Sequence, residues 1–245
     1  YDGLDGTPET VDEYFDLLDA LSLKGISTFV CSMSEARWYW NDLQYGFVAQ
    51  YEGEDRALLN LTFDGEATFP DGTFTADECE AEGVLTRTNA KGEKEQYVTI
   101  TEKNAWMLSR QAGKTEYIKF LRKLMSTNYA DDSLFGGGLG YRKAQHDFLA
   151  SANKSEGRIA MLLDGEFWEN EARPDFNELG MINKDFAYGK RDFRFMPIPQ
   201  ANGGKNEKPT FFVNGSGPCF INAKTTKADA AGAFVQYLYS NYGAN

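Results

Sequence analysis

The sequence predicts an α/β fold in which helices flank a sheet. Two apolar stretches, residues 26–31 and 159–163, have the length of strands, and segments with helical spacing of apolar residues lie before and after them. The run IAMLL at 159–163 does not alternate with polar residues, so it predicts a central strand covered on both faces, as in a parallel sheet between helices. At 245 residues the chain is long enough for one large domain or two modest ones.

The first helix and strand are predicted from local signals. Thr10 to Glu13 match a T-x-x-E capping box, and apolar residues then recur at helical spacing until Gly25. Residues 26–31 are apolar and partly β-branched, which predicts a short strand directly after that glycine. The chain is therefore expected to begin with a helix followed by a strand.

A second helix is expected to open at Ser34 or Glu35, and its first turn contains the aromatic run WYW at 38–40. Consecutive helical side chains point about 100° apart, so the three rings cannot all face one interior. At least one of them should be exposed, just beyond the end of the preceding strand.

The middle of the chain changes character. Residues 58–100 are punctuated by Asp-Gly and Lys-Gly pairs, which predicts irregular surface hairpins with short strands at 67–69 and 96–100. From 101 to 128 the apolar spacing is helical, and Gly113 is expected to break that segment into two helices or one bent helix.

The last part of the chain begins with a helix at 141–153 that leads to the apolar strand, with Ala144, Phe148 and Leu149 facing inward. The elements expected after that strand are a strand at 193–198 ended by prolines, a linker at 200–208, extended pieces at 210–213 and 218–223, and a helix at 228–239.

The composition excludes several classes of function. With 25 Lys and Arg against 37 Asp and Glu, the formal charge of -12 repels phosphate backbones, so no nucleic-acid partner is expected. Three scattered cysteines and a single histidine, His146, have no metal-binding spacing, so neither a metal nor a cofactor is implied. No apolar run approaches the 18 or so residues that a membrane helix needs.

The strongest functional signal is the stretch GRIAMLLDGEFW at 157–168. Asp164 and Gly165 should end the strand, and Asp164 is expected to cap a helix that opens at Glu166. Open α/β sheets bind ligands just beyond the carboxyl ends of such strands. Carboxylates at Asp164 and Glu166, with the rings of Phe167 and Trp168, offer the hydrogen-bond acceptors and flat apolar faces that a sugar requires. The alternative is that Asp-Gly closes a hairpin and Trp168 packs into the core.

Several segments together resemble the extracellular solute-binding proteins of ABC importers, the group that includes maltose-binding protein and its oligosaccharide-binding relatives. The likeness spans nearly the whole chain except 64–100, and it lies in the order of the motifs. The segments that carry it are PETVDEYFDLLDALSLKGIS at 8–27, SMSEARWYW at 32–40, KSEGRIAMLLDGEFW at 154–168, FRFMPIPQ at 193–200 and GSGPCFINAKTTKADAAGAFVQYL at 215–238.

The resemblance implies a type II periplasmic-binding-protein-like lobe with a mixed sheet flanked by helices. Residues 1–208 would form the second lobe, with a surface hairpin insertion near 62–100. Residues 209–245 would form the hinge crossing and a returning segment that packs on a first lobe absent from this chain. The apolar stripe of the last helix should then be exposed or covered by another molecule. The missing initiator Met and leader favour a processed or excised piece.

The function that the resemblance implies is capture of a solute, expected to be an oligosaccharide, for delivery to an ABC permease in the membrane. The protein would be extracellular, either lipid-anchored at the cell surface or periplasmic, and would catalyse no reaction. Arg37 replaces a family aromatic beside Glu35, which implies a changed sugar or a non-sugar solute. The expected ligand-binding residues are Glu35, Arg37, Trp38, Tyr39, Asp164, Glu166, Phe167, Trp168 and Asn214.

Two other classes of function stay open. In a glycoside hydrolase, Asp164 and Glu166 would be the paired carboxylates, because residues i and i+2 of a strand share a face about 6.5 Å apart. An adhesion or scaffolding module would use the same aromatic residues against a protein partner. Serine hydrolysis is disfavoured, because Ser216 lies in N-G-S-G rather than in G-x-S-x-G.

Overall fold

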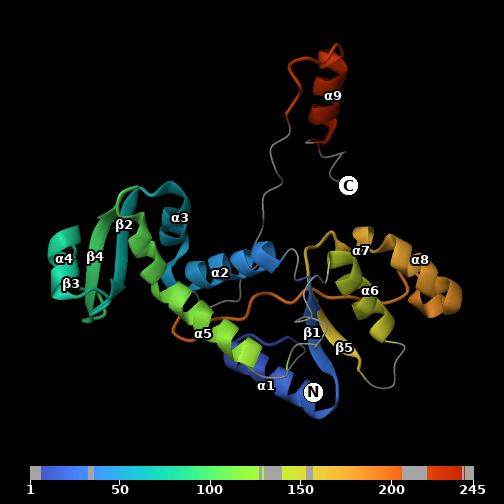
Figure 1. The fold of residues 1–245 in the computed structure, drawn as a ribbon, viewed down its shortest axis with the longest axis horizontal. Coiled ribbons are helices and arrows are strands. Elements are labelled where there is room, and N and C mark those ends of the chain that lie inside the picture. The colour runs from blue at the N-terminus through green and yellow to red at the C-terminus, as the bar shows by residue number, and fades with distance from the viewer. Residues whose placement is uncertain are drawn as a thin grey trace. The chain divides into compact units, whose positions relative to one another are not determined.

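A computed structural model describes residues 7–32, 36–126, 129, 140–152, 157–205, 220–238 and 240, with only the backbone at 36, 37 and 126. The chain divides into two compact units, Tyr1–Phe212 and Val213–Asn245. The larger unit is mixed α/β, with helices beside small sheets (Figure 1). This agrees with the predicted fold class. The described strands form two separate sheets, however, and not one mixed sheet.

The elements have the following bounds. The helices are α1 (Val11–Leu23), α2 (Ala36–Glu52), α3 (Glu54–Thr62), α4 (Ala76–Glu82), α5 (Ala112–Ser126), α6 (Tyr141–Ser151), α7 (Trp168–Glu171), α8 (Arg173–Ile182) and α9 (Ala228–Leu238), with short 3₁₀ helices η1 (Ala105–Arg110) and η3 (Lys184–Phe186). The strands are β1 (Ser27–Cys31), β2 (Gly65–Pro70), β3 (Leu85–Thr88), β4 (Lys94–Ile100) and β5 (Ile159–Leu163).

Helix α1 begins as predicted. The Oγ1 atom of Thr10 accepts a hydrogen bond from the Glu13 backbone N–H at 3.2 Å, and the Glu13 carboxylate accepts one from the Thr10 N–H at 3.4 Å. These two bonds satisfy backbone groups that the first helical turn leaves unpaired. The inward face of α1 then contributes Tyr14, Phe15 and Leu18 to the main hydrophobic core.

Strands β1 and β5 form a two-stranded parallel sheet, with Ser27 opposite Ile159 and Cys31 opposite Leu163. Both strands were predicted. The prediction that 159–163 is covered on both faces is wrong, because none of its residues is fully buried and Ala160 is exposed. Within the described part of the chain β5 has only β1 as a neighbour, and α6 packs against the pair. The partner strand β1 is more deeply buried, since all its residues except Ser27 are buried.

The region predicted as irregular hairpins is instead a small folded body. Strands β2, β4 and β3 form an antiparallel sheet in that spatial order, and α3, α4 and η1 pack with it. Its core is separate from the main one and consists of Leu59, Ala67, Phe69, Phe74, Val84, Val98, Ile100, Met107 and Leu108. Buried Gln96 bonds both backbone groups of Phe74, at 2.8 and 2.9 Å, and so fixes the turn before α4.

Gly113 does not break a helix as predicted. It lies inside α5, and the interruption comes at Gln111, between η1 and α5. A Cβ atom at Gly113 would lie 2.7 Å from the Cα of Val48 and 2.9 Å from the carbonyl oxygen of Phe47. This glycine therefore permits the backbones of α2 and α5 to cross closely.

The chain returns past α1 after η3. Residues 193–198 were predicted as a strand, but among the described residues only Ile198 of this segment is in a β-bridge, and Pro197 and Pro199 have no N–H to donate to a ladder. Gln200 forms an isolated parallel bridge with Thr10, through bonds of 3.0 Å from the Val11 N–H and 2.7 Å to the Glu9 carbonyl oxygen. The entering and returning segments therefore run side by side.

The start of the predicted linker, residues 200–205, is fixed to α2 by Gln50. The fully buried Gln50 amide donates to the carbonyl oxygens of Ile198 and Pro199, at 3.3 and 3.1 Å, and accepts from the Ala201 N–H at 2.8 Å. The Gln50 backbone oxygen also accepts a bond of 2.7 Å from the Lys205 N–H. Residues 200–205 are therefore packed against α2 and do not form a free linker. Residues 206–208 lie outside the described residues.

The smaller unit contains the predicted last helix as α9. Its stripe includes Phe234 and Leu238, which are 59% and 42% exposed, while Ala231 and Val235 are half-buried. The extended piece predicted at 210–213 and the turn at Asn214 lie outside the described residues, and residues 220–222 form no strand. The predicted assignment of 209–245 to a hinge and return segment stays a prediction.

No helix in the described part of the chain is both long enough and apolar enough to cross a membrane.

Candidate ligand-binding site

Two of the predicted site segments meet beyond the sheet. Strands β1 and β5 are parallel and end together at Cys31 and Leu163, so the chain leaves both from the same edge. Tyr39 lies in the first turns of α2 and Asp164 directly follows β5. The Tyr39 hydroxyl donates a hydrogen bond of 3.0 Å to Oδ1 of Asp164. This contact joins residues from opposite halves of the chain at the position where open α/β sheets bind ligands.

Asp164 does not cap a helix at Glu166 as predicted. Its Oδ1 atom accepts a bond of 2.7 Å from the Gly165 N–H, which tightens a turn, and the Gly165 carbonyl accepts from the Trp168 N–H at 3.1 Å. Helix α7 begins only at Trp168. The carboxylate of Asp164 is thereby kept at the end of the strand.

Gln145 and Glu171 belong to the same network and were not predicted. Gln145 is fully buried in α6, and its Nε2 group donates to Oδ2 of Asp164 at 2.9 Å and to Oε2 of Glu171 at 3.1 Å. The sequence contained one signal for Gln145, since it lies beside Ala144 and four residues before Leu149 on the inward face of the predicted helix. Glu171 had no such signal, because its place depends on the turn that precedes α7.

Trp168 was predicted as a ligand-binding residue, and the structure places its side chain in a hydrophobic core. It is 6% exposed and packs edge-on or tilted against Phe148, Phe193 and Phe176, with ring centroids 5.7, 4.9 and 6.0 Å away. The turn at Gly165 directs this ring into the core formed with α6 and α8. The alternative that Trp168 packs inside is confirmed, whereas the hairpin alternative is wrong because β5 pairs in parallel with β1.

The neighbouring aromatic residues are exposed. Phe167 is 50% exposed and Trp38 is 59% exposed, while Trp40 packs against the main core. The Phe167 ring folds back over Gly165, where an added Cβ would clash with the ring. Glu166 is also exposed. The prediction that at least one ring of 38–40 faces solvent is confirmed.

Three predicted ligand residues cannot be placed. Glu35 and Asn214 lie outside the described residues, and only the backbone of Arg37 is described, in the first turn of α2. Among the predicted residues that follow the two strands, those with described side chains outside the cores are thus Trp38, Tyr39, Asp164, Glu166 and Phe167.

The described carboxylates of the site take part in no ion pair with the described residues. The ion pairs found among the described residues do not include Asp164, Glu166 or Glu171. Burial, and after it the negative charge of Asp164, raise the pKa of the Cys31 thiol to about 12. Burial therefore favours the neutral form of the Cys31 thiol.

The pairing expected for a glycoside hydrolase is absent, because Glu166 lies in the turn after β5 and not two residues along a strand. The carboxylate that shares a hydrogen-bond donor with Asp164 is that of Glu171. The single histidine, His146, bonds Asp175 at 2.8 Å through Nδ1. In the described part of the chain, no three His, Cys, Asp or Glu residues are grouped so as to hold a metal ion.

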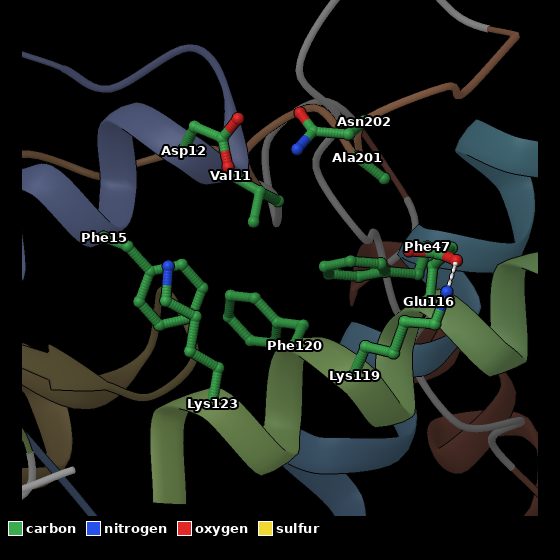
Figure 2. A pocket seen from close by; sticks show the side chains of 10 residues that line it. All are labelled: Val11, Asp12, Phe15, Phe47, Glu116, Lys119, Phe120, Lys123, Ala201 and Asn202. Atoms are coloured by element: carbon green, nitrogen blue, oxygen red, sulfur yellow. Dashed lines mark hydrogen bonds and ion pairs between the residues drawn. The ribbon is translucent and has the colours of Figure 1, made fainter. Parts of the chain in front are cut away.

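A separate hollow of about 130 Å³ lies between α1, α2 and α5 (Figure 2). Three phenyl rings face it, those of Phe15, Phe47 and Phe120. Its two lysines are engaged, since Lys119 pairs with Glu116 at 2.6 Å and the Lys123 ammonium lies 4.0 Å from the centre of the Phe15 ring. The hollow is smaller than the 300 Å³ or so typical of ligand pockets, and none of the predicted site residues faces it.

No protein-family model matches the sequence, and no curated protein matches it either. The resemblance to solute-binding proteins therefore stays a prediction carried by the motifs quoted above.

Proposed function

We propose that the chain is a ligand-binding lobe, of the type II periplasmic-binding-protein kind, from an extracellular solute-binding protein of an ABC importer. It captures an oligosaccharide and presents it to a membrane permease, without catalysis. The observation that carries this proposal is the Tyr39–Asp164 bond at the carboxyl edge of the parallel pair. Trp38 and Phe167, which are close to these two residues in the sequence, have exposed rings. In this proposal, residues 209–245 return towards the other lobe of the complete protein.

Each group in the site has a distinct role in the proposed binding. The faces of Trp38 and Phe167 stack on sugar rings, which removes apolar area worth about 25 cal/mol per Å² from water. The carboxylates of Asp164 and Glu166 accept hydrogen bonds from sugar hydroxyls. Glu35, Arg37 and Asn214 remain candidates from the sequence alone.

Affinity in this single lobe is expected to be low. A micromolar complex corresponds to about 8 kcal/mol, and part of the gross interaction energy is lost to ordering the partners. A lobe that covers one side of the ligand leaves the other side in water. Millimolar binding, about 4 kcal/mol, is therefore the expected range for this chain.

The test is a titration of the isotope-labelled protein with maltotriose, xylotriose and cellotriose, followed by NMR. Binding should shift the signals of residues 36–40 and 164–168, and replacement of Trp38 or Phe167 by Ala should weaken it at least about fivefold. Trp106→Ala is the matched control, because Trp106 is 45% exposed but belongs to the antiparallel region.

Three outcomes would count against the proposal. If Trp106→Ala lost as much affinity as Trp38→Ala or Phe167→Ala, the assignment of the site would be wrong. If none of the saccharides bound, the proposed function would be wrong. Release of reducing ends during the titration would favour the glycoside hydrolase instead.

A further inference from the structure

The antiparallel body, residues 54–110, is joined to the rest of the larger unit by two short links. The chain enters it through Gly53, between α2 and α3, and leaves it through Gln111, between η1 and α5. Gly53 has a φ of 88°, which favours glycine, and the backbone at Gln111 is extended. Among the described residues, none belongs to both the main core and the core of the antiparallel body. The two links are therefore the positions at which one body can turn against the other.

Polar side chains connect the two links. Gln111 is 1% exposed, and its amide accepts a bond of 3.0 Å from Asn60 and donates one of 3.4 Å to the carbonyl oxygen of Arg56. The Lys114 ammonium also donates to the Asn60 side chain. Water can replace such bonds when the bodies separate, whereas apolar surface exposed to water has no substitute partner. A polar junction therefore opens more easily than an apolar one.

Glu52 places a buried carboxylate at this junction. It is the last residue of α2, directly before Gly53, and is 7% exposed. Its Oε1 atom accepts a hydrogen bond of 3.2 Å from the N–H of Gly113, two residues after Gln111. That N–H lies in the first turn of α5, where a helix offers its N–H groups no acceptor. One side chain therefore joins the two links.

Three cations act on the Glu52 carboxylate, one from α3, one from α5 and one from the returning segment, namely Arg56, Lys114 and Lys205. Lys205 also feels the charges of Glu95 and Lys91, which have opposite signs, and the neighbouring titratable group on α2 is Tyr51. Burial outweighs the bond from Gly113 and the three cations, and it raises the pKa of Glu52 above 4.5.

Opening of the junction returns the Glu52 carboxylate to water. Because burial raises its pKa, the closed junction binds a proton more tightly than the open one. Closure is therefore most favourable below 4.5 and becomes less favourable as the pH rises through the raised pKa. At neutral pH the buried charge favours opening.

We propose that the antiparallel body turns on the main core at Gly53 and Gln111, and that the charge of Glu52 controls this hinge. Protonation of Glu52 closes the hinge, and ionisation loosens it. The hinge lies within the larger unit and is separate from the crossing between lobes that the proposed function assigns to residues 209–245.

The test measures the orientation of the two bodies in the full chain by residual dipolar couplings. Couplings are collected for β2 and β4 and, beside the main core, for α1 and β1, at about pH 7 and about pH 4.5. At the higher pH the antiparallel body should be aligned about 1.5-fold more weakly than the main core, because its motion averages the couplings. At the lower pH the two alignments should agree.

Hydrogen exchange at the Gly113 N–H provides a second measurement. After correction for the intrinsic effect of pH, this exchange should slow at least about threefold between the higher and the lower pH. Each unit by which the pKa of Glu52 differs between the closed and open junction changes the closing equilibrium about tenfold.

Variants separate Glu52 from the other carboxylates. Glu52→Gln is uncharged at both pH values and keeps an oxygen for the Gly113 N–H, so the two bodies should align equally at both. Glu54→Gln, which removes an exposed carboxylate two residues away, is the matched control and should behave like the original chain. Lys205→Met removes one of the cations and should shift the change in alignment to higher pH. Melting curves check that each variant is folded.

Three outcomes would contradict the proposal. Equal alignment of the two bodies at about pH 7 in the original chain would overturn the hinge. Weaker alignment that neither acid nor Glu52→Gln changes would overturn the control by Glu52. An effect of Glu54→Gln as large as that of Glu52→Gln would show that loss of any nearby negative charge is sufficient.

Discussion

In the larger unit the parallel pair joins strands that are more than a hundred residues apart in the sequence, whereas the antiparallel sheet is made entirely from residues 65–100. The parallel pair depends on helices and on the returning segment for its core. The antiparallel sheet encloses its own core with α3, α4 and η1. The predicted site residues whose side chains are described all lie near the parallel pair. In this chain the candidate site therefore lies beyond strands that distant segments bring together, and none of its described residues comes from the self-contained sheet.

The largest expected effect comes from variants that test whether the core of the antiparallel sheet and the core around Trp168 unfold separately. Phe69→Ala and Trp168→Ala each remove a large ring from a different core and should each cost about 3–5 kcal/mol. Hydrogen exchange should show loosening of residues 65–108 in Phe69→Ala with β1 and β5 still protected. Trp168→Ala should loosen α6 to α8 and the candidate site. Faster exchange everywhere in both variants would show that the cores unfold as one unit.

The next effect concerns the hydrogen bonds by which Gln50 of α2 holds the returning segment. Gln50→Leu would leave two carbonyl oxygens and the Ala201 N–H buried without partners, so a loss of about 3 kcal/mol in unfolding free energy is expected from denaturant titration. The control is Gln44→Leu on the same helix, where the side chain makes no comparable bonds and a change below about 0.5 kcal/mol is expected. Similar losses of unfolding free energy in both variants would show that the Gln50 hydrogen bonds do not contribute specifically to stability.

A smaller effect is expected at the crossing of α2 and α5. Gly113→Ala places a methyl group against the backbone of α2 and should cost about 1–3 kcal/mol, despite the better helix propensity of Ala. Gly232→Ala in α9 meets only one side-chain atom, at 4.0 Å, and should leave α9 as helical or more so by circular dichroism. A stabilised Gly113→Ala variant would mean that the helices do not approach this closely.

The smallest effect is a dependence on pH in the antiparallel region. Hydrogen bonds from Arg110, followed by that from the Thr75 N–H, lower the pKa of Glu78 from 4.5 to about 2. Because the folded pKa is depressed, this contribution to stability is present above 4.5 and is lost as the pH falls towards about 2. Glu78→Gln should flatten the decline of the unfolding midpoint in that range, whereas Glu80→Gln should not. Identical acid profiles for both variants would contradict the pairing.

The sequence predicted elements whose signals are local. The capping box at Thr10 and the apolar runs of β1 and β5 depend on neighbouring residues, and these elements are present. The antiparallel core was not predicted, because its residues meet only after strands pair across the chain. Phe167 and Trp168 are adjacent and similar in type, so only distant rings such as Phe193 determine which one is buried. The network of Gln145 and Glu171 was missed for the same reason.

The bridge between Thr10 and Gln200 has an implication for engineering. At this bridge the segment that begins the larger unit and the segment that ends it are parallel, and their backbones are about 4.8 Å apart. If residues 10–200 were inserted into a surface loop of a host protein, the two ends of the host chain would have to be separated by only about one strand spacing. Residues 10–200 are thus suited to insertion into another protein as a domain, so that binding at the candidate site could change a measurable property of the host protein.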